Sequence, residues 1–209
     1  MKIGIIAASG KAGNIIMREA ISRNHEVTAI VRNKNKINID CNIIEKSLNE
    51  LDDDDLKNID VLVNAFDSAP GNEIEHVIFG KKLIVLLENK KTRLIVVGGA
   101  GSLFINDEKT IKLYDTPDFP KEYLNVSINS SKNLDNLKKS KNINWTYISP
   151  AAIFDPNGER TGKYKIGKDN LILNKNKQSY ISYEDYAIAL IDEIENPKHI
   201  NSRFCVVSE

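Results

Sequence analysis

The sequence predicts an α/β fold, a doubly wound parallel sheet with a small substrate-side lobe after its sixth strand. Short apolar runs alternate with longer segments of helical periodicity along the 209 residues, without a linker, repeat or low-complexity block. The chain also opens on an apolar run that passes through a turn of small residues into a helical pattern. Strands that alternate with helices form parallel sheets that are covered on both faces.

The strands and helices follow from the periodicity of the apolar residues. The predicted strands are residues 2–7, 26–31, about 42–48, 60–65, 92–99, 144–150 and 203–208. Residues 12–23, 73–90 and 128–141 have helical spacing. Ser182 and Asp185 resemble a capping box, which predicts another helix that ends near Glu195.

Two stretches interrupt this alternation. Residues 100–127 and 151–181 contain several Gly and Pro residues and show little periodicity. In an open α/β sheet, ligands bind beyond the carboxyl ends of the strands. Since both stretches follow strands, we expect both on the ligand side of a single domain that spans residues 1–209, with 151–181 as a substrate-side insertion.

The composition argues against a charged macromolecular partner. Lys plus Arg and Asp plus Glu each number 29, so the formal net charge is zero and gives no reason to expect nucleic acid or an anionic membrane. No apolar run approaches the roughly 18 residues of a membrane span. Cys41 and Cys205 match no metal spacing, which indicates two buried, reduced thiols in a cytoplasmic protein. We expect a monomer or a homodimer.

The turn after the first strand has the features of an anion site. It consists of Ala7, Ala8, Ser9, Gly10, Lys11, Ala12 and Gly13. A helix N-terminus presents unpaired N–H groups, and small residues let the backbone approach a diphosphate. The strict G-x-G-x-x-G pattern of dinucleotide sites is absent, because an alanine replaces one glycine, and the P-loop pattern fails as well. A tight turn without a ligand is the alternative.

The end of the second strand indicates which dinucleotide would bind. The strand ends on Val31 and Arg32, where NAD sites usually have Asp or Glu. A guanidinium group matches the 2′-phosphate of NADP(H) in charge and geometry, and Ser9 could add a hydroxyl. We therefore expect NADP(H) as the cofactor. The alternative is a basic turn exposed to solvent.

Further segments carry a family resemblance nearly from end to end. They are HEVTAIVRN at 25–33, VVGGAGSL at 96–103, WTYISPAAIF at 145–154, GERTGKYKIGKD at 158–169 and ISYEDYAIALIDEIENP at 181–197. Together with the opening turn, they resemble the atypical short-chain dehydrogenases of the NmrA-like type, most of all the small bacterial NAD(P)H-flavin reductase-like proteins. The chain departs from that pattern at Ala7 for the first glycine, at Ser9 for the usual Thr, and at Asn157.

The resemblance implies a Rossmann-type NAD(P)-binding domain with sites at the ends of its strands. The expected cofactor contacts lie in the turn, at the end of the second strand and after three later strands: Ala7, Ser9, Gly10, Lys11, Ala12, Gly13, Arg32, Ala65, Phe66, Gly98, Gly99, Ser149, Pro150 and Ala151. Lys132 lies where the family's helix carries a Lys and is the candidate catalytic residue, with a solvated helix Lys as the alternative. The residues expected on the acceptor side are Ser102, Phe154, Arg160 and Tyr164. No metal site is expected.

The residue types favour hydride transfer without a dedicated acid. Conventional short-chain dehydrogenases use Tyr-x-x-x-Lys on the helix after the fifth strand, but residues 128–141 contain no Tyr. The match at Tyr164–Lys168 follows the sixth strand, and we interpret it as coincidence. Reduction of a carbonyl needs an acid, whereas a flavin ring delocalises the charge that it gains, so alignment of two flat rings is enough.

Two functions remain open from the sequence. The first is an NADPH-dependent oxidoreductase that transfers a hydride to a small-molecule acceptor, a flavin or a quinone-like ring. The alternative is an NmrA-like, NADP-binding redox sensor that performs no chemistry and signals to a protein partner. A reductase needs a pocket over the nicotinamide, and the irregular segment 151–181 favours that reading.

Overall fold

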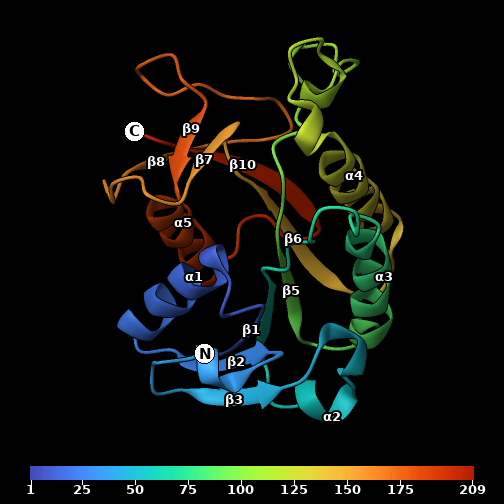
Figure 1. The fold of residues 1–209 in the computed structure, drawn as a ribbon, viewed down its shortest axis with the longest axis vertical. Helices are drawn as coiled ribbons and strands as arrows, with labels where there is room; N and C mark the ends of the chain where they lie inside the picture. Colours follow the sequence, from blue (N-terminus) through green and yellow to red (C-terminus); the bar gives the residue numbers. More distant parts are fainter.

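The computed structural model describes residues 1–209 and is built around one eight-stranded sheet in the order β3-β2-β1-β4-β5-β6-β10-β8. The strands of this sheet are β1 (Lys2–Ile6), β2 (Glu26–Val31), β3 (Asn42–Glu45), β4 (Val61–Asn64), β5 (Arg93–Val97), β6 (Asn144–Ser149), β8 (Tyr164–Gly167) and β10 (Ser202–Ser208). Only β8 is antiparallel to its neighbour, β10. The chain winds from β1 to one side and continues from β4 to the other, so the topological switch point lies between β1 and β4 (Figure 1).

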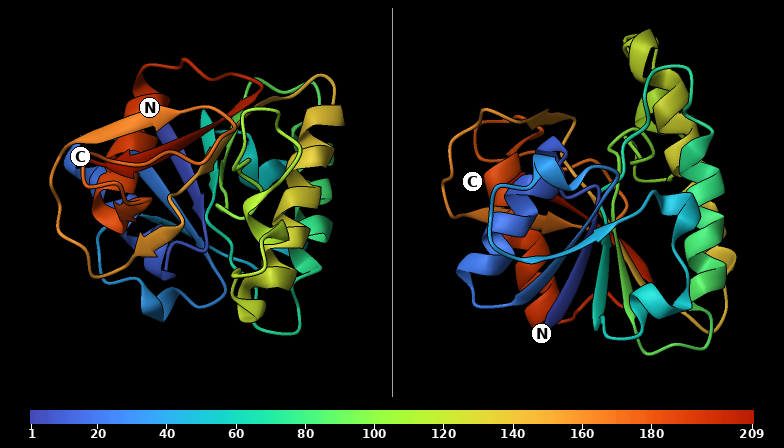
Figure 2. Two further views of the ribbon diagram at one scale, coloured as in Figure 1. Left: turned by 90° about the horizontal axis from the view of Figure 1, so that it is seen from above. Right: turned by 60° about the horizontal axis from the view of Figure 1, so that its bottom comes forward.

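Helices cover both faces of the sheet. α1 (Lys11–Ser22) and α5 (Tyr183–Glu195) pack together on one face, and α3 (Glu75–Leu87) and α4 (Leu124–Lys139) pack together on the other (Figures 1 and 2). The single turn α2 (Asp53–Leu56) begins at a capping box of Asp52 and Asp55. The 3-10 turns are η1 (Lys34–Lys36), η2 (Leu48–Glu50), η3 (Leu113–Asp115) and η4 (Lys121–Tyr123).

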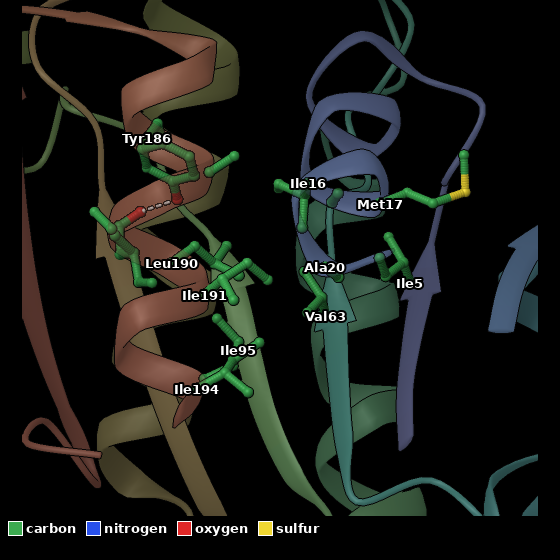
Figure 3. Packing of buried hydrophobic residues seen from close by; sticks show 14 of the residues in the cluster. Ile5, Ile16, Met17, Ala20, Val63, Ile95, Tyr186, Leu190, Ile191 and Ile194 are labelled. Atoms are coloured by element: carbon green, nitrogen blue, oxygen red, sulfur yellow. Dashed lines mark hydrogen bonds between the residues drawn. The ribbon is translucent and has the colours of Figure 1, made fainter. Parts of the chain in front are cut away.

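Alternate residues of the central strands divide the core into two layers. Figure 3 shows Ile5, Val63 and Ile95 facing α1 and α5, where Ile16 and Leu190 are among their neighbours in the core. Leu62 and Leu94 face the other way, toward α3 and α4. This alternation fixes the register of the sheet, because a shift by one residue would exchange the two faces.

The predicted strands and helices are confirmed with small shifts of their ends, but the sequence did not predict three short strands after β6. β7 (Ile153–Asp155) pairs in parallel with β9 (Tyr180–Ser182), and β8 extends the main sheet beyond β10. β7 and β9 contain three residues each. Segments of this length are too short for an alternating pattern to be recognised.

The predicted capping box at the start of α5 is only half formed. Oγ of Ser182 accepts a hydrogen bond from the amide of Asp185 at 3.0 Å. The buried carboxylate of Asp185 turns instead to the lobe, where the amides of Thr161 and Gly162 each donate to it at 2.9 Å. Oγ of Ser208 also donates to this carboxylate, at 2.7 Å. Asp185 therefore fastens the lobe to the end of the sheet.

The structure bears on two further expectations, the burial of the two cysteines and the absence of a membrane-spanning helix. Cys205 is buried, as expected, whereas Cys41 is only partly buried, because β3 lies at the edge of the sheet; both are free thiols. No helix combines the length and the apolar character that crossing a bilayer would require.

Candidate functional site

The turn between β1 and α1 has a strained backbone and no room for a side chain at Gly13. Ala7 has φ of 57°, in the left-handed region that glycine adopts most readily. A Cβ atom at Gly13 would lie 2.3 Å from the carbonyl oxygen of Ala7, and one at Gly10 would lie 3.1 Å from the same oxygen. Gly13 is thus required for the helix to pack against the turn, and Ala7 occupies the position at which the family pattern has glycine.

The N-terminus of α1 is open. Gly10 is the N-cap residue and provides no side-chain cap, and the first turn contains no acidic residue. The amide of Asn14 donates to Gly10 at 2.9 Å, but the amides of Lys11, Ala12 and Gly13 have no acceptor in the protein. Three free N–H groups and the positive end of the helix dipole make this turn suitable for a diphosphate.

A free cation lies near this turn, at the end of the adjacent strand β2. Arg32 is exposed and forms no hydrogen bond or ion pair. The nearby carboxylate of Glu45 is engaged by Lys34, whose amide donates at 3.0 Å and whose Nζ lies at 3.4 Å. The guanidinium group of Arg32 is therefore available to an anionic ligand.

The remaining expected cofactor contacts follow three neighbouring strands. Ala65 and Phe66 follow β4, Gly98 and Gly99 follow β5, and Ser149, Pro150 and Ala151 end or follow β6. Because β1, β4, β5 and β6 are adjacent and parallel, these residues and the α1 turn lie along one carboxyl edge. A Cβ atom at Gly99 would meet no atom within 4 Å, so this edge is open above β5. Oγ of Ser149 is buried without a partner.

The lobe contributes an aromatic wall beside this edge. The ring of Phe154 lies 3.9 Å from that of Tyr183 and 4.8 Å from that of Tyr186, measured between centroids. Burial raises the pKa of Tyr183, and the charges of Asp67 and Asp155 raise it further. Tyr183 could not be recognised from the sequence, because it is the first residue of α5 and its helical position gives no sign that its ring lies against Phe154 of β7.

Two of the expected site residues are Ser102, which is bonded within the protein, and Lys132, which faces solvent. Oγ of Ser102 is buried and accepts from Arg203 at 2.9 Å, so this side chain anchors the loop after β5 to β10. Lys132 is exposed and forms no hydrogen bond, whereas its neighbours Ser131 and Asn133 are buried. The expected catalytic Lys therefore projects from the solvent side of α4, because the inward positions of the helix are one residue away.

Arg160 and Tyr164 both bond to carboxylates of the helices that cover one face of the sheet. Nη1 of Arg160 lies 2.7 Å from the carboxylate of Glu19 on α1, and the hydroxyl of Tyr164 donates to Asp192 near the end of α5 at 2.6 Å. Burial alone would raise the pKa of Glu19, but the hydrogen bonds from Arg160 and Arg23 lower it. Both expected substrate residues instead join the lobe to the outer side of α1 and α5.

The chain contains no group of three or more His, Cys, Asp or Glu side chains that could hold a metal ion. The features along the carboxyl edge are instead free amides, one free guanidinium group and an aromatic wall. Such a combination can hold an anionic, partly aromatic ligand in an extended arrangement.

Comparisons with known proteins bear on that ligand. A model of the family described as NAD(P)H-binding matches residues 7–197. The uncharacterized protein YwnB of Bacillus subtilis (strain 168) is 58% identical over 211 residues, which cover 100% of this chain and 99% of that protein.

Solved structures have the same fold. The crystal structure of SP1627 from Streptococcus pneumoniae TIGR4, described as a "putative NADH-flavin reductase", is 44% identical with a TM-score of 0.96 and covers 100% of both chains. A protein from Lactobacillus casei is 29% identical with a TM-score of 0.89, and the match covers 100% of this chain and 99% of that one.

Proposed function

The chain belongs to the NAD(P)H-binding family, and on that premise we propose that it is an NADPH-dependent oxidoreductase that reduces a flavin or a quinone-like ring. The observation that carries this proposal is the open N-terminus of α1 beside the free guanidinium group of Arg32. The flavin reductase description of the relative from Streptococcus pneumoniae supports the choice of acceptor.

The residues present fit a nicotinamide dinucleotide. The amides of Lys11, Ala12 and Gly13 would hold the diphosphate, and Gly10 keeps its approach open. A reduced nicotinamide supplies a hydride, that is, two electrons and one proton. The open edge at Gly99 and the buried, unpartnered Oγ of Ser149 suit the polar nicotinamide end.

Arg32 supports NADPH rather than NADH. Its guanidinium group has no protein partner, and neither Asp nor Glu stands beside it at the end of β2 to receive ribose hydroxyls. Neighbouring Asn33 is used internally, because its side chain accepts from the amide of Asn35 at 3.0 Å. A 2′-phosphate would give Arg32 the charge-assisted contact that it lacks.

On the acceptor side, the protein's main task is alignment of the two rings. The rings of Phe154 and Tyr183 are in contact and tilted by 38° to each other, and they form an apolar surface that suits an aromatic ring. Holding two planar reactants in register can lower a barrier by about 7–11 kcal/mol in favourable cases. Lys132 and Tyr164 are not needed for this task, since one faces solvent and the other binds Asp192.

The direct test is NADPH oxidation by the purified protein with a panel of flavins and quinones. We expect turnover with at least one planar acceptor and lower affinity for NADH than for NADPH. Lys132→Ala and Tyr164→Phe should retain activity. If either variant binds NADPH normally but loses about 10⁴-fold in rate, the loss would be that of an essential proton-transfer group. Tight NADPH binding without turnover would favour the redox sensor instead.

A further inference from the structure

Three polar side chains from two segments meet beside the end of β5. Nζ of Lys112 donates to the hydroxyl oxygen of Tyr114 at 3.0 Å and to Oγ of Ser131 at 3.2 Å. The same ammonium group lies 5.3 Å from the centroid of the Tyr114 ring. Tyr114 belongs to η3 and Lys112 immediately precedes it, whereas Ser131 lies on the buried side of α4. All three are at least partly buried.

This cluster borders the open part of the carboxyl edge. The amide of Tyr114 donates to the carbonyl oxygen of Gly101 at 2.9 Å. A Cβ atom at Gly101 would touch Ser127 and lie 3.5 Å from the Tyr114 ring, whereas one at Gly99, two residues earlier, would meet nothing within 4 Å. The loop after β5 that carries Tyr114 therefore lies next to the open space at Gly99. In Figure 1 this loop, which leads into α4, and the lobe that carries β7 and β9 lie on opposite sides of the upper part of the molecule.

The hydrogen-bond directions leave one donor free. An ammonium group only donates, so the hydroxyl oxygen of Tyr114 must accept from Lys112. The hydrogen of that hydroxyl has no acceptor anywhere in the chain. Since Lys112 occupies one side of the oxygen, the hydrogen points away from the ammonium group and is available to a ligand.

We propose that Tyr114 is a catalytic residue, whose hydroxyl donates a hydrogen bond to a carbonyl oxygen or ring nitrogen of the acceptor and gives its proton to that atom. This inference rests on the proposed function and restricts the acceptor to planar rings that carry such an atom. The acceptor gains one hydride from the reduced nicotinamide, which is thereby oxidised, and one proton from the O–H of Tyr114. The phenolate left beside the ammonium group of Lys112 regains a proton from water. Lys112 and Ser131 are positioning residues.

The first test is Tyr114→Phe, which removes only the hydroxyl oxygen. With a naphthoquinone acceptor, we expect kcat to fall by about 10²-fold or more, the usual contribution of a positioned acid, while the dissociation constant of NADPH stays unchanged. Tyr164→Phe is the matched control, because it removes the same group from the α5 side of the lobe, where it binds Asp192. Its turnover should equal that of the wild type.

A second readout needs no cofactor. Flavin fluorescence reports binding of FMN to the protein alone, and Tyr114→Phe should raise the dissociation constant about 2- to 10-fold, as expected for one lost hydrogen bond. Lys112→Met should lower kcat for the quinone with little change in KM, and Lys112→Arg should restore part of it, because a cation again holds the hydroxyl.

The outcomes separate the two proposals. If the wild type turns over a quinone and Tyr114→Phe matches it in both kcat and FMN binding, Tyr114 has no catalytic role and the proposed function stands. If Lys112→Met lowers kcat but Lys112→Arg lowers it equally, the positioning role is wrong. A wild type that reduces no acceptor in the panel contradicts the proposed function, and the role of Tyr114 falls with it.

Discussion

α1 and α5 both begin at the carboxyl edge of the sheet and pack side by side on one face. Their N-termini differ in whether a side chain caps the first amides. We call the N-terminus of α5 sealed because Ser182 caps the amide of Asp185, and because the buried carboxylate of Asp185 receives donors from the lobe and from Ser208. α1 has no side-chain cap and leaves its first amides free. The capped end of α5 holds the lobe, whereas the uncapped end of α1 leaves N–H groups that can donate to an anionic ligand, as the proposed diphosphate site requires.

The largest expected effect is the loss of NADPH binding in Gly10→Val, which would cover the uncapped N-terminus of α1. Gly10 has φ of −77°, which valine can adopt, so we expect a folded protein. The branched side chain would cover the free amides and abolish NADPH binding, as measured by calorimetry beside a circular dichroism spectrum. Glu184→Val places the same side chain at the sealed end of α5 and should leave binding intact. Tight binding by Gly10→Val would show that the diphosphate lies elsewhere.

The next effect is a loss of stability when Asp185, at the sealed N-terminus of α5, is replaced. Asp185→Ala would leave the amides of Thr161 and Gly162 and the hydroxyl of Ser208 without their acceptor. We expect a loss in the free energy of unfolding on the order of 3 kcal/mol, because each hydrogen bond to a charged group contributes about 1.5–3 kcal/mol, while the amides of the exposed residues Thr161 and Gly162 can turn to water. Denaturant titration measures this loss.

The rate of cleavage by trypsin tests the same variant independently, since Lys163 lies next to the amides that lose their acceptor. The lobe of the Asp185→Ala variant should be cleaved faster than that of the wild type under native conditions. Glu184→Ala is the control, because the only hydrogen-bond or ion-pair partner of the Glu184 side chain is Arg160, at 3.5 Å. Equal cleavage and equal stability of both variants would mean that Asp185 does not fasten the lobe.

The third prediction concerns Arg32, whose free guanidinium group lies near the uncapped N-terminus of α1. Loss of a charge-assisted contact costs about 1.5–3 kcal/mol, so Arg32→Ala should weaken NADPH binding about 10- to 100-fold. NADH binding should hardly change, since NADH lacks the 2′-phosphate. Lys57→Ala removes an equal charge from an exposed residue before β4, at the opposite edge, and controls for net charge. Equal affinity of the wild type for NADPH and NADH would remove the argument for Arg32.

The sequence predicted the parts of the molecule whose signals are local. The β1–α1 turn, the alternation of strands and helices and the N-cap at Ser182 depend on neighbouring residues, and the structure contains them. The lobe was predicted as irregular, because β7 and β9 are held together only by pairing between residues far apart in the chain.

The direction of a side chain was harder to predict than its position. Lys132 misses the inward face of α4 by one residue, a difference of about 100° around a helix. Arg160 was expected to bind the acceptor, but its partner is Glu19, which is 141 residues away in the chain. Lys112 and Tyr114 could not be recognised from the sequence, because their spacing is that of a 3-10 turn rather than that of the Tyr-x-x-x-Lys helix motif.

The smallest expected effect lies in the strained backbone that keeps the α1 end open. Ala7 adopts φ of 57°, which costs an L-residue about 1–2 kcal/mol, whereas glycine adopts it freely but loses more entropy on folding. Ala7→Gly should therefore raise the free energy of unfolding by about 0.5–1 kcal/mol, which corresponds to a rise of about 2 °C in Tm. Asn24→Gly, at the other end of α1 with φ of 63°, is the control and should gain less, because asparagine tolerates this region. A loss of stability in Ala7→Gly would mean that the methyl group of Ala7 contributes more by packing than its backbone conformation costs.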